Sequence, residues 1–326
     1  MPTWGEILIE LKQKVEEGVK APFDLVRRKY LAATYKKTGR NTILYATKWT
    51  QAGDIDPELL MITDEDVQGL MEVIHGLKGP NLDLILHSPG GSPEATEALV
   101  SYLRTKFSDI RVIIPQSAMS AATMLACASN RIVMGKHSFI SPIDPQLILH
   151  TPVGVQAVPA QAILDQFELA KSECEDPKKL GTWIPILSQY GPALLIQCEN
   201  AIALSKQLIK EWLKSYMFAD SEDADVKSSK IADTLADHRE FKSHGRHINR
   251  DKAKEMGLII EDLEEDQEFQ DLVLSVFHAT THTFNGTNAV KIIENHNGKA
   301  FIKQQQKVII QQAPSQLKAP DKHQEQ

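Results

Sequence analysis

The stretch LILHSPGGSPEATEALV, residues 84–100, decides how the rest of the chain is interpreted. It passes from apolar residues into a Pro-Gly-Gly turn and then into a pattern typical of a helix. Glycine allows sharp turns and lets another molecule approach bare backbone N–H groups. The paired glycines therefore indicate either a plain turn or a place where a reacting atom is held, and other parts of the sequence must separate these two interpretations.

Short apolar segments alternate with helical segments along this part of the chain. LDLIL at 82–86, IRVIIP at 110–115 and RIVM at 131–134 predict buried strands, with helices expected at 94–106 and 121–129. Upstream, TILYAT at 42–47 predicts another strand. Strands that alternate with helices pair in parallel and are covered on both faces. The sequence therefore predicts an α/β fold built on a parallel sheet.

Two turns are expected at the same edge of this sheet. The Pro-Gly-Gly turn comes after the strand at 82–86, and a second turn at 116–120 comes after the strand at 110–115. In parallel sheets, ligands bind beyond the carboxyl ends of the strands. We therefore expect the two turns to be neighbours at a ligand-binding edge.

The composition excludes several classes of protein. The 326 residues are 42% hydrophobic and 24% charged, with a formal net charge of −7, and no basic stripe of the kind that binds nucleic acid stands out. No apolar run reaches the roughly 18 residues of a membrane span, and the charged N-terminal residues differ from a signal peptide. Three cysteines without CxxC spacing favour reduced thiols. We expect a cytoplasmic protein without a transmembrane segment.

The hydrophobic periodicity divides the chain into four segments. We expect an N-terminal helical extension at 1–38, a core at 39–265, a C-terminal helical segment at 266–302 and a disordered tail at 303–326. The core includes long helices between about 160 and 218. The first helix is expected to bury the face that carries Trp4, Leu8, Leu11 and Val15.

Ser120 is the candidate nucleophile. It stands at the start of a helix composed almost entirely of small residues, in the stretch PQSAMSAATMLACASN. A serine at a helix N-terminus lies where free N–H groups favour developing negative charge. The alternative is an ordinary N-cap serine on a tightly packed helix. If the two turns meet, the N–H of Gly90 or Gly91 and that of Ala121 could form a two-donor oxyanion hole.

Three stretches together carry a family resemblance. LILHSPGGSPEATEALVSYLR, PQSAMSAATMLACAS and IVMGKHSFISPIDPQL resemble the serine dehydrogenase proteinase family, a branch of the Clp-fold serine peptidases related to signal peptide peptidase A and the Clp proteolytic subunit. The resemblance extends from about residue 28 to 299. It implies a Clp/crotonase-like sheet of repeated β-α units, peptide or protein substrates and a homo-oligomer. It also implies Ser120 as nucleophile, with Gly90 and Ala121 as oxyanion donors.

The general base is less well defined. Asp144, in SPIDPQ, stands where the Clp subunit has its histidine. Signal peptide peptidase A uses a lysine placed further downstream, and this similarity makes Lys171 the candidate base of a Ser-Lys acyl-enzyme mechanism. Such a lysine must be neutral, which requires burial. The acidic residues around Lys171 also fit a surface lysine, and His137 and His150 are alternative bases.

No cofactor or metal is expected. His278 and His282 are four residues apart, and His244 lies close to His247, but HExxH and paired-cysteine patterns are missing. The sequence also lacks a Walker motif for ATP.

Two other functions fit parts of the sequence. The crotonase fold of acyl-CoA hydratases and isomerases shares the sheet and uses two backbone donors, but it needs no serine at the helix start. A non-catalytic peptide-binding scaffold fits a chain that has Asp144 in the histidine place and acidic residues around Lys171.

Overall fold

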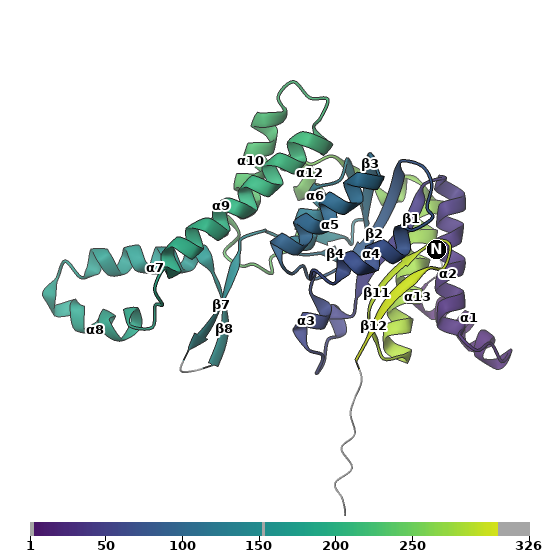
Figure 1. Cartoon of the computed structure of the whole chain (residues 1–326), viewed down its shortest axis with the longest axis horizontal. Coiled ribbons are helices and arrows are strands. Elements are labelled where there is room, and N and C mark those ends of the chain that lie inside the picture. Colours follow the sequence, from purple (N-terminus) through teal and green to yellow (C-terminus); the bar gives the residue numbers. More distant parts are fainter. Residues whose placement is uncertain (1–2, 152–153, 306–326) are drawn as a thin grey trace, which may run out of the picture.

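A computed structural model describes residues 3–151 and 154–305, and a seven-stranded sheet forms its centre (Figure 1). The strand order is β10-β5-β3-β2-β1-β11-β12, parallel from β10 to β1, with β11 and β12 antiparallel. The predicted α/β fold with a parallel sheet is confirmed. The strands are β1 (Asn41–Thr47), β2 (Asn81–His87), β3 (Asp109–Ile114), β5 (Arg131–Met134), β10 (Ile260–Asp262), β11 (Ala289–Asn295) and β12 (Ala300–Gln304).

Helices cover both faces of the sheet, and each face has its own apolar cluster. One face packs against α4 (Asp66–Ile74), α5 (Pro93–Lys106), α6 (Ala121–Cys127), the end of α9 (Leu194–Trp212) and α10 (Ala224–Ala236). The other face packs against α2 (Pro22–Thr38) and α13 (Gln267–Gly286). Because both faces are covered, the predicted strands are apolar on both faces beyond their charged amino ends, rather than alternating between apolar and polar residues.

The N-terminal helix α1 (Trp4–Glu16) packs outside α2 and α13 through a face that matches the expected one only in part. Ile7 and Leu11 are buried, whereas Trp4 and Val15 are exposed. The periodicity of the sequence does not fix which of two adjacent apolar rows faces inward. The backbone carbonyl of Trp4 accepts a hydrogen bond from His282 on α13 at 2.9 Å, which helps to set this orientation.

An arm leaves the core between β6 (Phe139–Ile140) and the end of α9 (Figure 1). It consists of the hairpin β7 (Gln146–Thr151) and β8 (Gly154–Pro159), helices α7 (Ala160–Glu173) and α8 (Pro177–Leu187), and the first turns of α9. This confirms the long helices expected after residue 160. The arm has a small apolar cluster of its own, separate from those of the sheet.

The chain returns from the arm through several short elements. These are η2 (Leu213–Met217), α11 (His238–Phe241), β9 (Ile248–Asn249), α12 (Arg250–Glu255) and η3 (Leu263–Glu265). Earlier in the chain, η1 (Trp49–Gln51) and α3 (Pro57–Leu60) come after β1, and β4 (Ser117–Ala118) lies between β3 and α6. Strand β9 pairs with β6, so residues near 248 lie beside the segment that comes before Ser141.

The C-terminal segment 266–302 is not wholly helical as expected. Helix α13 is succeeded by β11 and β12, which extend the central sheet beyond β1. The expected disordered tail at 303–326 also begins too early, because Lys303 and Gln304 belong to β12. The rest of that expectation, from residue 306, lies outside the described residues.

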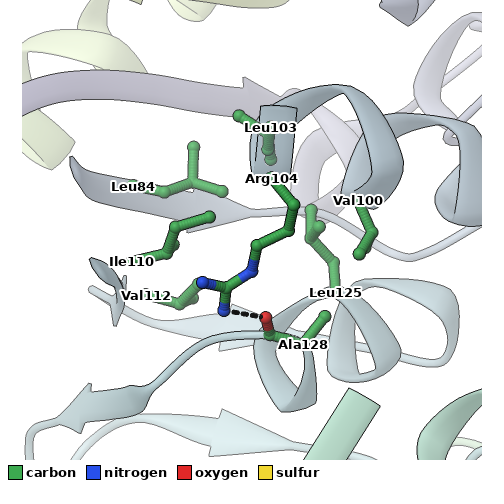
Figure 2. Close-up of a pocket in the computed structure, with 8 residues that line it drawn as sticks. All are labelled: Leu84, Val100, Leu103, Arg104, Ile110, Val112, Leu125 and Ala128. Atoms are coloured by element: carbon green, nitrogen blue, oxygen red, sulfur yellow. Dashed lines mark hydrogen bonds between the residues drawn. The ribbon is translucent and has the colours of Figure 1, made fainter. Parts of the chain in front are cut away.

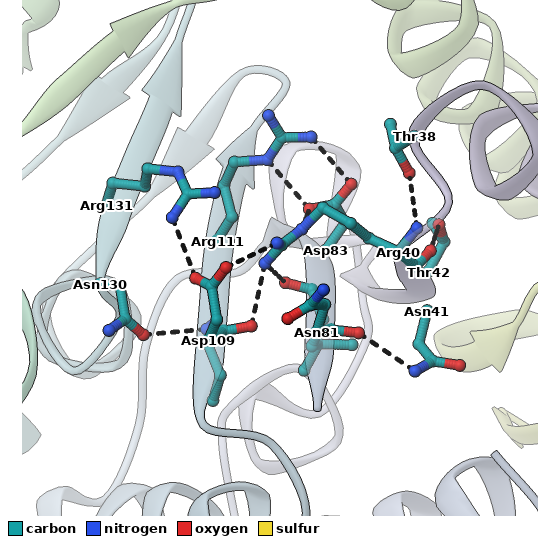
Figure 3. Close-up of polar contacts among 12 residues, drawn as sticks. Thr38, Arg40, Asn41, Thr42, Asn81, Asp83, Asp109, Arg111, Asn130 and Arg131 are labelled. Carbon is teal, nitrogen blue, oxygen red and sulfur yellow. Dashed lines mark hydrogen bonds and ion pairs between the residues drawn. The ribbon is translucent and has the colours of Figure 1, made fainter. Parts of the chain in front are cut away.

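Ion pairs between arginine and aspartate side chains connect the amino ends of the parallel strands (Figure 3). The buried carboxylate of Asp83 on β2 accepts from Arg40 at 2.7 Å and from Arg111 on β3 at 2.9 Å. Asp109 accepts from Arg40 at 2.7 Å and from Arg131 on β5 at 2.9 Å. These pairs bridge neighbouring strands at the edge opposite the two turns, so the register of the sheet is fixed away from the candidate site.

Arg104 holds the far end of the small-residue helix α6 (Figure 2). Its guanidinium donates to the carbonyl of Ala128 at 2.5 Å, stacks 3.7 Å from the ring centre of Tyr216, and adjoins a cavity of about 10 Å³. Burial lowers the pKa of Arg104 to about 10. A cation at this end also complements the helix dipole.

Candidate functional site

The two turns predicted to be neighbours are in direct contact. A Cβ placed on Gly90 would lie 2.5 Å from the carbonyl oxygen of Met119 and 2.8 Å from the Cβ of Ser120. The backbone N–H of Met119 donates to the carbonyl of Ser88 at 2.9 Å. Gly90 also has φ +96°, a conformation that favours glycine. Glycine is therefore required here for close approach to Ser120 as well as for the turn.

Ser120 has a strained backbone and does not cap its helix. Its φ of 52° and ψ of −121° are rare for a residue with a side chain, and its hydroxyl makes no capping bond. Its side chain has no hydrogen-bond partner among the described residues, and the residue is half-buried. Ser120 is thus the N-cap residue by position, but its hydroxyl does not cap the helix. A strained turn from β4 into α6 presents the hydroxyl instead, as nucleophile turns do.

Ser141 holds this strained turn in place. Its Oγ accepts the backbone N–H of Ser120 at 2.6 Å and donates to the carbonyl of Pro142 at 2.8 Å. Its own N–H donates to the Oγ1 of Thr123 on α6 at 3.1 Å. The segment after β6 is thus fastened to the first turn of α6, so the residues just beyond Ser141 lie close to Ser120.

Two of the expected oxyanion donors are free. Among the described residues, the N–H groups of Gly91 and Ala121 donate to no acceptor. The N–H of Gly90 donates to the Oγ of Ser88 at 3.2 Å. Of the two glycines, Gly91 is therefore the available donor and Gly90 is the residue that permits close approach.

Asp144 binds two histidines that come from distant parts of the chain. Its Oδ2 lies 2.8 Å from the Nδ1 of His238, and its Oδ1 lies 2.9 Å from the Nδ1 of His244. The Asp144 side chain is 2% exposed, and the two imidazoles are 17% and 23% exposed. A carboxylate that accepts from Nδ1–H leaves the Nε2 of the same ring able to accept a proton.

Asp144, which binds both histidines, lies a short stretch of chain beyond the residue that bonds the Ser120 backbone. Asp144 is separated from Ser141, the partner of the Ser120 backbone, by Pro142 and Ile143, a span of at most about 10 Å. The N–H of Ile143 donates to the carbonyl of Leu235 at 2.9 Å, which draws the segment before His238 to the same place. These contacts bring Asp144 and its two imidazoles toward the edge of the sheet where Ser120 lies.

Lys171 does not lie in such an environment. It is in the last turn of α7, on the arm (Figure 1). Its amine is 3.0 Å from Glu168, and its side chain is 60% exposed. The single chain does not provide the burial that a neutral lysine requires, because α7 projects away from the sheet and leaves the amine exposed; Lys171 as the base stays a prediction.

Sequence reasoning misses the two histidines that bind Asp144. His137 and His150, the alternative bases, are both exposed, and His150 is on the arm hairpin. The sequence suggests for His244 only a possible metal-ligand role, and it suggests none for His238. Three histidines occur between 238 and 247, and this concentration is the available signal. It lies more than a hundred residues beyond Ser120, far from the place where the Clp subunit has its histidine.

Within residues 3–151 and 154–305, no group of three or more histidine, cysteine, aspartate or glutamate side chains is arranged to hold a metal ion. His282 bonds the backbone of Trp4 instead. In the same ranges, no helix has the length and apolar character needed to cross a membrane.

Two curated relatives come from Methanocaldococcus jannaschii, and both are uncharacterised proteins. One is 26% identical over 206 residues, which cover 63% of this chain and 62% of the relative. The other is 35% identical over 92 residues, which cover 28% of this chain and 32% of the relative. The chain therefore matches less than two thirds of the length of either relative.

A solved structure and a family profile also match. The structure is of the 1510-N membrane-bound stomatin-specific protease in a mutant form, with a TM-score of 0.33 and 16% identity over 69% of this chain and 79% of that one. The profile of ClpP-like, SDH-type serine proteinases matches residues 57–274, a range that contains Ser120, both glycines and the Asp144 cluster. Since this range is most of the chain, the protein belongs to the family of ClpP-like, SDH-type serine proteinases.

Proposed function

We propose that this protein hydrolyses peptide bonds through an acyl-enzyme on Ser120, with a histidine held by Asp144 as the general base. The observation that carries the proposal is the strained, uncapped Ser120 beside two free backbone N–H groups, with an Asp144–histidine cluster three residues beyond the Ser141 that bonds the Ser120 backbone. Family membership supports the serine peptidase class. The base and the oxyanion donors are inferred from the geometry alone.

The chemistry takes the usual steps of acyl transfer. The Ser120 hydroxyl gives its proton to the Nε2 of His238 or His244 while its oxygen attacks the peptide carbonyl carbon. The carbonyl oxygen becomes an oxyanion and accepts hydrogen bonds from the N–H groups of Gly91 and Ala121. The C–N bond then breaks, and the imidazolium protonates the leaving amine. A water molecule next gives a proton to the imidazole and attacks the acyl-enzyme carbonyl, and the Ser120 oxygen leaves with that proton as the acid is released.

Lys171 is the alternative base. It would need a second copy of the chain to cover the arm and exclude water from its amine, because its own chain leaves it paired with Glu168 and exposed. Asp144, by contrast, is buried and already orients two imidazoles. The single-chain geometry therefore favours histidine over lysine.

A homo-oligomer is part of the same proposal. Large apolar side chains are exposed along the arm, and burying them against another copy would be favourable. They include Ile148, Val155, Leu169, Ile184 and Ile196. Light scattering of the purified protein should give a mass that is a multiple of 36.4 kDa.

Labelling with a fluorophosphonate tests the proposed mechanism. The Ser120 oxygen attacks phosphorus, fluoride leaves, and the base takes the hydroxyl proton. We expect wild type to take one label, Ser120→Ala to take none, and the more important of His238→Ala and His244→Ala to react at least about 100-fold more slowly.

Equal labelling of wild type and Ser120→Ala would contradict the proposal. A protein that binds peptides but neither labels nor turns them over would be the non-catalytic scaffold. Binding of CoA thioesters with full activity in Ser120→Ala would indicate the crotonase-type alternative.

A further inference from the structure

A buried ion pair lies beside the segment that supports the Gly90–Gly91 turn. The Nζ of Lys291 on β11 is 2.8 Å from both carboxylate oxygens of Asp66, the first residue of α4, and both side chains are 0% exposed. The hydroxyl of Tyr45 donates to the same carboxylate at 2.8 Å. None of these residues takes part in the proposed chemistry.

The position of this pair needs a reason other than stability. Burial lowers the pKa of Lys291, against the opposing effect of the Asp66 charge. Taking both charges out of water is costly, and apolar residues of similar volume often stabilise a core equally well. A buried pair of this kind is better explained by what it holds in place.

The pair holds the backbone on both sides of Ile62. Lys291 donates to the carbonyl of Met61 at 2.6 Å, and Asp66 accepts the backbone N–H of Thr63 at 3.0 Å. Residues 61–63 belong to the connection 61–65 between α3 and α4, which contains no helix or named strand. The ion pair therefore fixes a segment that regular secondary structure does not fix.

Ile62 in turn contacts the glycine turn through its backbone. Its N–H donates to the carbonyl of Gly90 at 2.7 Å, and its carbonyl accepts the N–H of Ser92 at 3.1 Å. A Cβ placed on Gly91 would lie 2.3 Å from the Ile62 carbonyl oxygen. The two backbones are thus packed against each other without an intervening side chain.

This contact determines where the free N–H of Gly91 points. The carbonyl of Gly90 and the N–H of Gly91 belong to one planar trans peptide unit, in which the two groups point in opposite directions. Because the carbonyl is directed at Ile62, the N–H of Gly91 is directed away from Ile62. The Ile62 hydrogen bond therefore orients the proposed oxyanion donor.

We propose that Lys291 and Asp66 are positioning residues for the oxyanion hole. Through Met61 and Thr63 they hold Ile62 against Gly90, and so they aim the N–H of Gly91 at the carbonyl oxygen of the substrate. This inference rests on the proposed serine peptidase function. It adds a role for residues that lie outside the nucleophile and base.

The test compares Lys291→Met with Arg27→Met. Arg27 forms an equally buried ion pair with Glu294, also on β11, and its hydrogen bonds go to Glu294, Thr283 and Asp24 instead of to residues 61–63. We expect the rate constant for fluorophosphonate labelling, per folded molecule, to fall about 100-fold in Lys291→Met and less than 3-fold in Arg27→Met. Affinity for a non-cleavable peptide should change less than 3-fold in both.

Hydrogen exchange gives a second readout that does not depend on activity. The amides of Ile62 and Ser92 should lose protection in Lys291→Met and keep it in Arg27→Met. If Lys291→Met does not fold, Asp66→Asn removes the charge while keeping an acceptor for Thr63, and its labelling rate should fall at least 10-fold.

The outcomes separate this inference from the proposed function. Wild-type labelling at Ser120 with an unchanged rate and unchanged exchange in Lys291→Met would overturn the role of Lys291 alone. Equal losses in Lys291→Met and Arg27→Met would show a general effect of destabilisation and would also overturn it. Absence of any label on wild-type Ser120 would contradict the peptidase proposal itself.

Discussion

The edge of the sheet around Ser120 and the arm that carries Lys171 are built in different ways. At the edge, Ser120 is held by Ser141, and Gly90 is held by Ile62, through backbone contacts that leave little room for movement. The arm has a small apolar cluster and many exposed apolar side chains. The comparison indicates that groups needing fixed geometry lie at the sheet edge, whereas the arm exposes apolar side chains that another molecule could cover.

The largest expected effect comes from the carboxylate at the sheet edge. Asp144→Asn should lower the rate of peptide hydrolysis about 10⁴-fold, because an amide cannot hold both imidazoles with Nε2 free to accept a proton. Thermal unfolding of the variant should be measured alongside, since Asp144 is buried. A rate within 3-fold of wild type, in a folded variant, would mean that the edge does not supply the base.

A second effect comes from the close approach of Gly90 to Ser120. Gly90→Ala should lower the labelling rate at least 100-fold, because the added Cβ would lie 2.5 Å from the Met119 carbonyl oxygen and push the turns apart. Gly76→Ala is the matched control: its φ is also positive, at +86°, but no atom lies within 4 Å of the added Cβ. Equal losses in both variants would show that strain alone, and not the contact with Ser120, matters.

A buried histidine, His87, should make the stability of the protein depend on pH. Burial lowers the pKa of His87, at the end of β2, to about 4, and its ring packs against Trp49 and Phe277. The unfolded chain takes up this proton near pH 6.5 and the folded chain only near pH 4. The stability that depends on His87 being neutral is therefore fully present above pH 6.5 and is lost as the pH falls toward 4.

Denaturant unfolding across this pH range measures the effect. The free energy of unfolding should fall by up to about 3 kcal/mol between pH 6.5 and 4, beyond the contribution of other groups. His87→Phe should remove that part of the slope. An identical slope in His87→Phe would show that the proton is taken up elsewhere.

The smallest effect is expected on the arm. Lys171→Ala should change the rate of peptide hydrolysis less than 2-fold, because an exposed ion pair with Glu168 contributes little. A loss of 100-fold or more would contradict this assignment of the arm. It would mean that a second copy of the chain buries Lys171 beside Ser120.

Much of the sheet edge could be predicted from the sequence because its signals are local. The strands at 82–86, 110–115 and 131–134 fall inside β2, β3 and β5 or extend them by one residue, and the carboxyl-end rule placed Gly90 beside Ser120. Small residues after Ser120 predicted a tightly packed helix, and every residue of α6 is buried.

The remaining parts depend on contacts between distant residues. His238 and His244 reach Asp144 across about a hundred positions, and no local pattern indicates which carboxylate they bind. The strands β11 and β12 complete the sheet after a long helix, and the hydrophobic periodicity does not separate them from that helix. The positive φ of Ser120 is imposed by Ser141 and Gly90, so propensity at Ser120 could not predict it.

A crystal structure of the fluorophosphonate adduct tests the central claim most directly. We expect phosphorus bonded to the Oγ of Ser120, a phosphonyl oxygen within hydrogen-bond distance of the N–H groups of Gly91 and Ala121, and an imidazole held by Asp144 beside the Oγ. An adduct in which a lysine amine, from the same chain or another, occupies the place of that imidazole would contradict the account.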